Sequence, residues 1–365
     1  MSYTCVVIFG YFGCDNLGDE TNLSELVAFL RKIQPGIGIT VISVSPVATA
    51  KKLGVESVGK YNWTGIAEVF RKADLLIGGG GSLFQDRSSL RSLFYYVGLI
   101  FLARRFGLDV FLYGQGIGPV RSGVGKRMAR WALSQVKVIN ARDRISLLAL
   151  EGLRVHGPVV HLTAEPLLLK AQMPESAVKR YWEDIPTGGK YKLGLIPLEF
   201  EWLNIRFWSG LLDVLRRDNP ELYLMASAYE DLRLNQRLSK DFGIPILPVE
   251  NCWEMLQKAV GGLDLLVSAR LHGLVAAVIQ GTPCFGLALD PKIDGFCIPL
   301  QINYCPLSAD TQPLSLGNRI LNDLKHPVNV SKSRWLLWNF WQRYALKNQT
   351  VLKHFIMSTR VRGKS

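Results

Sequence analysis

Residues 264–292 read DLLVSARLHGLVAAVIQGTPCFGLALDPK and decide the fold class of this chain. The run Asp264–Ser268 predicts a short buried strand, Leu274–Gln280 the helix that follows it, and Pro283–Leu289 the next strand. A strand, a helix and a second strand in this order indicate a parallel sheet. In an open parallel sheet, ligands bind just beyond the carboxyl ends of the strands.

Three basic side chains come directly after these two strands. Arg270 and His272 follow the first strand, and Lys292 follows the second. Two permanent cations beside an imidazole, which titrates near neutral pH, suit a small, highly charged anion that undergoes proton-dependent chemistry. The alternative is a capped strand end without a ligand, with Lys292 on a solvated loop.

The same alternation of strands and helices runs through the rest of the chain in two series. The first series has predicted strands at 4–9, 39–44, 74–77, 109–113, 137–140 and 159–162. The second has them at 192–196, 222–227, 244–247, 265–268 and 284–288. We therefore expect an α/β fold with two doubly wound parallel-sheet domains that face a cleft, followed by a C-terminal helical tail.

A polar segment at 171–190, with Pro174 and Pro186, separates the two series. The expected domains are residues 1–172, residues 173–326 with the three basic side chains, and a tail at residues 327–365. We expect neither a secretory signal nor a membrane-spanning segment. The six cysteines form no CxxC pair and the five histidines are scattered, which favours a reducing cytoplasmic setting without a bound metal.

The net charge of +13 is concentrated in the tail, where residues 331–365 hold eight Lys or Arg and no acid. Aromatic and basic residues on one amphipathic helix are typical of a membrane interface, and a helix packed on its own protein is the alternative. We expect the tail to brace the first domain, with Trp335–Tyr344 packed on the protein and the segment from Lys347 onward in contact with lipid. Nucleic acid is not expected as a partner, because no nucleic-acid module accompanies the cations.

Glycine-rich loops follow three predicted strands of the first series, at 10–20, 78–86 and 114–119. Glycine lets the backbone approach a ligand closely, but none of these loops contains a phosphate-binding signature with a lysine. In the first loop, Asp19 and Glu20 already satisfy the positive end of the next helix, which favours a neutral ligand rich in hydroxyl groups.

Taken together, these motifs resemble the polysaccharide pyruvyl transferase family, and within it the CsaB-like enzymes of bacterial cell-wall polysaccharide synthesis. The resemblance covers about residues 8–298. The matching stretches are 13–20, 79–86, 114–119, Arg142-Asp143 with Ser146, 270–273, and 290–292 with Gly295-Phe296.

The resemblance implies a GT-B-like fold and transfer of pyruvate from phosphoenolpyruvate to two hydroxyls of a sugar, which forms a cyclic ketal and releases phosphate. It also implies that Arg142, His272 and Lys292 serve phosphoenolpyruvate. We expect His272 to act as the general acid and base, Arg142 and Lys292 to clamp the donor, and Arg270 to support it.

The acceptor is expected on the first domain, with Asp19 and Asp86 orienting or deprotonating its hydroxyls. The residues expected to bind it are Asn16, Gly80, Gly81 and Gln85. No cofactor is needed in this scheme. The expected partners are phosphoenolpyruvate, a lipid-linked sugar acceptor, and an anionic membrane surface bound by the basic tail. The expected location is the inner face of the cell membrane.

Two positions depart from the family pattern. Glu165-Pro166 stands where Asp-Pro is usual, and the strand that leads into Pro197-Leu198 lacks a nearby arginine. Two other functions stay open at this point. One is a GT-B glycosyltransferase that uses a nucleotide-sugar donor, and the other is a membrane-associated binding protein without catalysis.

Overall fold

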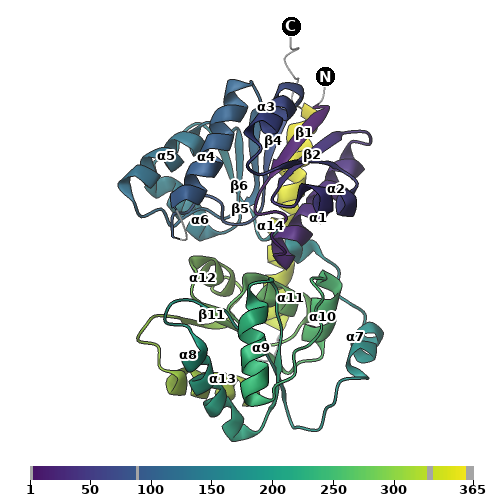
Figure 1. Cartoon of the computed structure of the whole chain (residues 1–365), viewed down its shortest axis with the longest axis vertical. Helices are drawn as coiled ribbons and strands as arrows, with labels where there is room; N and C mark the ends of the chain where they lie inside the picture. The colour runs from purple at the N-terminus through teal and green to yellow at the C-terminus, as the bar shows by residue number, and fades with distance from the viewer. Residues whose placement is uncertain (1–2, 88–89, 327–331, 359–365) are drawn as a thin grey trace. The chain divides into compact units, whose positions relative to one another are not determined.

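The structure is a computed structural model that describes residues 3–87, 90–326 and 332–358 (Figure 1). It divides into two compact units. The N-terminal unit contains residues 1–169 and 341–365, and the C-terminal unit contains residues 170–340. Each unit is built on its own parallel sheet, which confirms the predicted α/β class. Among the described residues, no helix has the length and apolarity needed to cross a bilayer.

The N-terminal unit has a seven-stranded sheet in the order β3-β2-β1-β4-β5-β6-β7. Its strands are β1 (Cys5–Phe9), β2 (Gly38–Ser43), β3 (Glu56–Gly59), β4 (Leu75–Gly79), β5 (Asp109–Gln115), β6 (Val138–Ala141) and β7 (Val159–Leu162). The winding of the chain reverses between β1 and β4, which are hydrogen-bonded neighbours. The loops after these two strands therefore flank the switch point, where open α/β sheets bind ligands.

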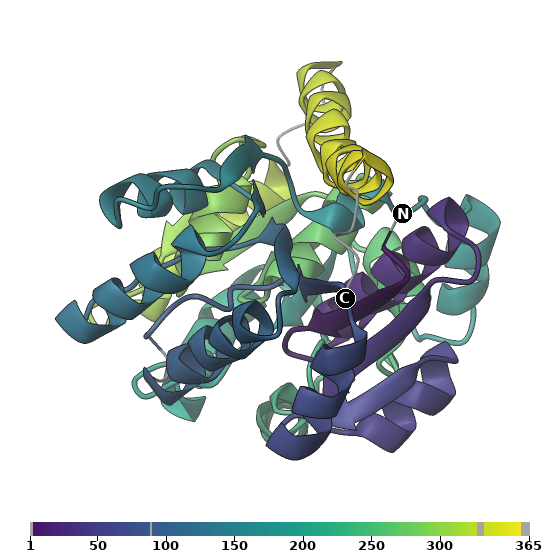
Figure 2. The same ribbon diagram turned by 90° about the horizontal axis from the view of Figure 1, so that it is seen from above.

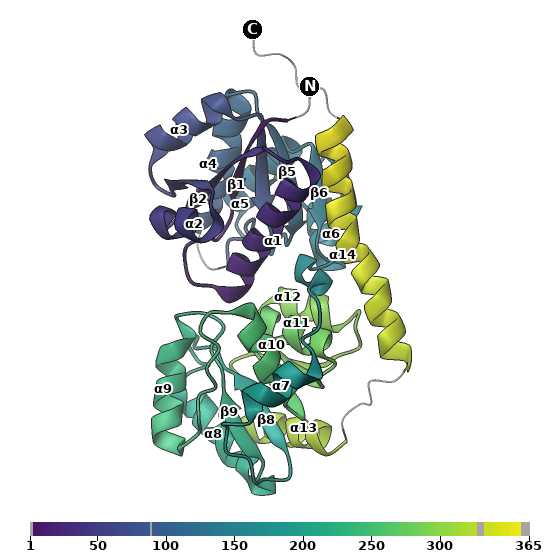
Figure 3. The same cartoon turned by 90° about the vertical axis from the view of Figure 1, so that its right-hand side faces the viewer.

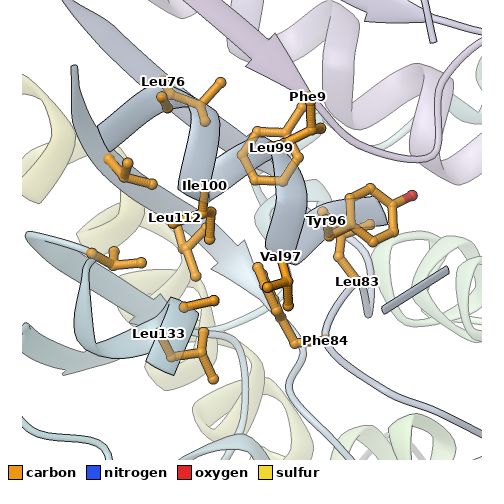
Figure 4. Close-up of a cluster of buried hydrophobic side chains, with 14 of the residues drawn as sticks. Phe9, Leu76, Leu83, Phe84, Tyr96, Val97, Leu99, Ile100, Leu112 and Leu133 are labelled. Carbon is orange, nitrogen blue, oxygen red and sulfur yellow. The ribbon is translucent and has the colours of Figure 1, made fainter. Parts of the chain in front are cut away.

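Helices cover both faces of this sheet. One face carries α3 (Trp63–Lys72), α4 (Leu90–Arg105), α5 (Gly123–Ser134) and α6 (Arg144–Gly152), and the other carries α1 (Leu17–Ile33), while α2 (Pro46–Leu53) lies beside β2 and β3. Figure 4 shows the first core, where Phe9, Leu76 and Leu112 of the sheet lie among side chains of α4 and α5. This burial of apolar surface holds the strand ends that carry the loops.

The C-terminal helix α14 (Lys332–Ser358) completes the second core of the N-terminal unit (Figures 2 and 3). Leu352 and Ile356 are fully buried there, and Phe355 stacks on Tyr3 with ring centroids 5.6 Å apart. Asn348 is also fully buried, and its side chain donates a hydrogen bond to the Ala164 carbonyl at 2.8 Å.

The tail therefore braces the N-terminal unit, as predicted, whereas contact of its segment from Lys347 onward with lipid stays a prediction. Leu352 and Ile356, two apolar side chains of that segment, are fully buried. Those side chains lie in the protein core, because an apolar helical face that suits a membrane interface also suits the face of a sheet. Residues 327–331 and 359–365, and the side chain of Trp335, lie outside the described part of the chain.

The C-terminal unit has a five-stranded sheet in the order β12-β11-β10-β8-β9. Its strands are β8 (Lys192–Ile196), β9 (Glu221–Leu224), β10 (Leu265–Ser268), β11 (Cys284–Ala288) and β12 (Asn303–Pro306). The helices α8 (Ile205–Leu215), α9 (Asp231–Phe242) and α13 (Pro313–Lys325) share one core with the sheet. Outside that core, α11 (Leu271–Gln280) and α12 (Pro291–Cys297) pack against β10 and β11, and α10 (Trp253–Gly261) packs between α11 and α7 (Glu175–Trp182).

The strand predictions fail at one edge of each sheet, whereas the strands at the other two edges, β7 and β9, were predicted. Residues 244–247 form only an isolated bridge, between Ile246 and Leu224, because Pro245 has no N–H to donate to a ladder. The sequence patterns miss β3 and β12, which are four-residue edge strands with few apolar residues. An edge strand is stabilised by one neighbour only, and its own pattern is correspondingly weak.

Candidate active site

The loop after β1 is shaped by polar side chains at the start of α1. Asn16 caps the helix, and its Oδ1 accepts a hydrogen bond from the Asp19 N–H at 3.3 Å. Glu20 accepts a hydrogen bond from the Gly13 N–H at 2.6 Å, and burial raises the pKa of this carboxyl. Asp19 and Glu20 thus lie in the first turn of the helix, as predicted, where their charge disfavours a phosphate.

The loop after β4 lies beside the start of α1. Gly80 and Gly81 have φ angles of +70° and +73°, in the left-handed region that favours glycine. A Cβ on Gly81 would lie 3.2 Å from Asp19 Oδ1, so the structure brings Asp19 beside this second glycine loop. Four of the predicted acceptor-site residues, Asn16, Asp19, Gly80 and Gly81, therefore gather at the switch point between β1 and β4.

Arg142, predicted to clamp the donor, lies in a buried polar network of the N-terminal unit. Its side chain is 5% exposed, with Nη1 3.2 Å from Glu165 Oε2, and its Nη2 donates to Ser82 Oγ at 3.0 Å. The other Glu165 oxygen accepts from Asn22 Nδ2 at 2.9 Å. Glu165, the departure from the Asp-Pro pattern, thus joins α1, the end of β6 and the second glycine loop. Arg142 thereby fixes the position of that loop.

The remaining polar residues of this loop bind neighbouring backbone. Asp86 accepts hydrogen bonds from the Arg121 and Ser122 N–H groups, each at 2.8 Å, and from the Ser122 hydroxyl at 2.7 Å. Burial alone would raise the pKa of Asp86, but these hydrogen bonds lower it below its ordinary value. Gln85 accepts from the Arg87 N–H at 2.7 Å. The oxygens of Asp86 thus anchor the loop at 119–122, and its role toward the acceptor hydroxyls stays a prediction.

His272 and Lys292 follow neighbouring strands of the C-terminal sheet. β10 is hydrogen-bonded to both β11 and β8, and the winding reverses between β10 and β8. His272 lies in the first turn of α11. This turn lies close to β10, since a Cβ added at Gly273 would be only 2.6 Å from Ser268 Oγ. Lys292 lies in the first turn of α12, where its N–H donates to the capping Asp290 at 3.0 Å. His272 thus flanks the switch point of this sheet, and Lys292 lies at the end of the next strand.

Arg270, the third cation predicted for this edge, is engaged by carboxylates of the C-terminal unit. Its Nη2 lies 2.5 Å from both Asp231 Oδ1 and Glu230 Oε1. Burial alone would lower the pKa of Arg270, but Asp231 and Glu230 raise it. The other Asp231 oxygen accepts from the Ser227 and Ala228 N–H groups. Arg270 therefore anchors the loop after β9, and the support of the donor expected of it stays a prediction.

The sequence analysis missed a cluster at the carboxyl edge of the N-terminal sheet. Its members are Tyr11, Lys60, Tyr61, Trp63, Tyr95 and Tyr96, and we call it the Lys60 aromatic cluster. Lys60 directly follows β3, and its Nζ lies between 4.9 and 6.0 Å from the four tyrosine ring centroids. Tyr61 is 73% exposed and Trp63 is 43% exposed. The aromatic residues that flank Lys60 in the sequence are a signal that could have found it.

The fold is that of GT-B proteins, as three solved structures illustrate. HepE from Anabaena, in complex with UDP-glucose, is 11% identical, with 97% of this chain and 100% of that chain covered and a TM-score of 0.64. A glycosyltransferase from Rickettsia africae is 12% identical, with 98% and 100% covered and a TM-score of 0.63. A UDP-GlcNAc 2-epimerase from Neisseria meningitidis, bound to UDP-GlcNAc, is 10% identical, with 96% and 99% covered and a TM-score of 0.64. At these identities the likeness shows the fold alone.

The family is decided by the sequence itself. Residues 16–291, well over half of the chain, match the model of the polysaccharide pyruvyl transferase family. The chain belongs to this family and is a transferase. The curated proteins gave no match.

Proposed function

We propose that this enzyme transfers pyruvate from phosphoenolpyruvate to two hydroxyls of one sugar and releases phosphate, forming a cyclic ketal. The observation that carries the proposal is that His272 and Lys292 follow the adjacent strands β10 and β11, with β10 at the switch point of the C-terminal sheet. Lys292 supplies a point charge for the phosphate or carboxylate of the donor. His272 moves the protons.

The reaction needs one proton donated and two removed. The methylene carbon of phosphoenolpyruvate takes a proton, and a sugar hydroxyl adds to C2 with loss of its own proton. The bond between C2 and the phosphate oxygen then breaks, phosphate leaves with the bonding electrons, and the second hydroxyl attacks C2 and loses its proton. An imidazole can serve in both directions, because its ordinary pKa lies close to neutral pH. Arg142 acts as a positioning residue through Ser82.

The acceptor side belongs to the N-terminal unit in this scheme. Asp19 and Asn16 hydrogen-bond sugar hydroxyls beside the glycine loop, and the exposed rings of the Lys60 aromatic cluster stack on the apolar faces of pyranose rings. Lys60 adds a positive charge for an anionic group of the acceptor. The acceptor is a lipid-linked precursor of a cell-wall polysaccharide, as in the CsaB-like branch of the family, and the enzyme works at the inner face of the cell membrane.

The decisive experiment offers the purified enzyme phosphoenolpyruvate together with candidate sugar acceptors. Release of phosphate, and a product whose mass grows by one pyruvate less one water, would establish the reaction. A thermal-shift panel of phosphoenolpyruvate against UDP- and GDP-sugars separates this donor from those of glycosyltransferases. Stabilisation by a nucleotide-sugar alone would replace the proposal by glycosyl transfer, and binding without turnover of either donor would indicate a protein that does not catalyse.

Lys292→Ala should weaken donor binding. The loss expected for one charge-assisted hydrogen bond is about 1.5–3 kcal/mol. Isothermal calorimetry with phosphoenolpyruvate measures it, and Lys240→Ala, which removes an exposed cation from α9 of the same unit, is the matched control. Equal donor affinity in the Lys292 variant and the parent would remove Lys292 from the donor site.

Trp63→Ala should raise the acceptor KM by about tenfold and change kcat little. A stacked ring stabilises the bound substrate and the transition state equally, so its loss weakens binding without slowing the bound complex. Trp131→Ala is a matched control, since Trp131 on α5 is 41% exposed and lies outside the cluster. Steady-state kinetics with a soluble acceptor analogue measures the effect. An unchanged KM for the Trp63 variant would place the acceptor elsewhere.

A further inference from the structure

The outer surface of α4 and α5 combines exposed aromatic rings with cations. We call it the α4–α5 surface, and it consists of Arg91, Phe94, Phe101, Arg105, Val124, Lys126, Arg127 and Trp131. Phe101 is 57% exposed and Trp131 is 41% exposed, and their ring centroids lie 5.8 Å apart. The two rings therefore join the exposed sides of neighbouring helices into one patch.

The spacing of these residues separates them from the core. On α4 the exposed residues at 91, 94, 101 and 105 form one stripe, because they follow the helical repeat. Leu93, Leu99, Ile100 and Ala103 are fully buried in the core with the sheet. Figure 4 shows Leu99 and Ile100 there. The core thus holds α4 in place without the exposed rings. Two large exposed rings that contact each other and are surrounded by cations indicate an interaction site.

The charge around the patch has one sign. Residues 87–135 contain eight Lys or Arg and one acid, Asp109. Asp109 lies 3.6 Å from Arg104 and accepts a hydrogen bond from the Tyr3 hydroxyl. Within the described part of the chain, Arg105, Lys126 and Arg127 form no ion pair, and all three are exposed. The partner of this surface is therefore an anion.

The exposed aromatic rings indicate that this anion is a lipid headgroup. Interleaved aromatic and basic residues on surface helices enter the headgroup region of a bilayer, where the rings leave water and the cations meet anionic lipids. Leu352 and Ile356 of α14, the helix of the basic tail predicted for this contact, are buried in the core and do not reach a bilayer. The geometry points to the α4–α5 surface as the site where this enzyme docks on an anionic membrane. The inference rests on the proposed function in one respect, that a lipid-linked acceptor would lie at that membrane.

The test is co-sedimentation of the full-length protein with vesicles of phosphatidylcholine, with and without phosphatidylglycerol. The parent should bind only the vesicles with phosphatidylglycerol, and binding should weaken as salt is added. Lys126→Gln/Arg127→Gln should bind them about tenfold less well. Phe101→Ser/Trp131→Ser should also lose about tenfold, because the rings no longer enter the interface.

Two controls make the result specific. Arg343→Gln/Lys353→Gln removes the same charge from exposed positions of α14 and should bind like the parent. Tyr229→Ser removes an exposed ring from the C-terminal unit and should bind like the parent as well. Equal loss in the α14 variant, or no loss in either α4–α5 variant, would overturn the inference. Phosphate release with a soluble acceptor, measured on the α4–α5 variants, should match the parent and tests the proposed function separately, since vesicle binding needs no turnover.

Discussion

His272→Ala should lower pyruvyl transfer by about 10²–10⁴-fold, the contribution typical of a general acid and base. The fold should be unaffected, because the side chain is only half-buried in the first turn of α11, and the neighbouring Leu271 and Gly273 make the close contacts with the unit. Donor affinity should change little, since Lys292 remains.

The measurement is phosphate release under saturating phosphoenolpyruvate, with near-UV circular dichroism as the check on folding. His326→Ala is the matched control, because His326 is an exposed histidine at the C-terminus of α13 in the same unit. Activity of the His272 variant within a few-fold of the parent would exclude His272 from the chemistry. A pH profile that keeps its neutral inflection in that variant would lead to the same conclusion.

Truncation after Leu346 should unfold the N-terminal unit. The deletion removes Leu352 and Ile356 from its core, and each such loss costs about 2–5 kcal/mol. It also removes the Phe355 ring that stacks on Tyr3, and the buried Asn348 that binds the Ala164 carbonyl. Together these losses are comparable with the whole stability of a typical domain, about 5–15 kcal/mol.

Calorimetric unfolding of the truncated chain should therefore lack the transition of the N-terminal unit. Leu352→Ala is the milder form of the test, with an expected loss of about 2–5 kcal/mol. Lys353→Ala is its matched control, since Lys353 is the exposed neighbour on the same helix. A truncated chain that keeps the unfolding temperature of the parent would show that α14 is dispensable to the core. The same burial makes this truncation unsuitable as a test of membrane binding.

Local pattern was sufficient for the elements that carry the candidate site. The apolar run before His272 predicts β10, because a fully buried parallel strand reads as a short continuous apolar segment. The glycines at 80 and 81 predict a loop after the strand, and Asp19 with Glu20 predicts a helix start. Each of these features depends on neighbours within a few residues, so the sequence alone contains them.

The roles of the charged residues depended on partners that are distant in the sequence. Arg270 binds Asp231, 39 residues away in the sequence, and Arg142 binds Glu165, 23 residues away. No local sequence pattern distinguishes a cation paired in this way from a cation that binds a ligand. Lys60 and Tyr95 come together only because β3 and α4 pack in one unit.

The sequence by itself therefore determined the two parallel sheets, their glycine-bearing strand ends and the family. Tertiary structure decided which cations are already neutralised, and on which surface the aromatic residues of α14 and α4 lie. The physical reason is one of range. Backbone propensity and the spacing of buried residues depend on neighbours within one helical turn or one strand, whereas an ion pair or a packed ring needs a partner that only the folded chain supplies.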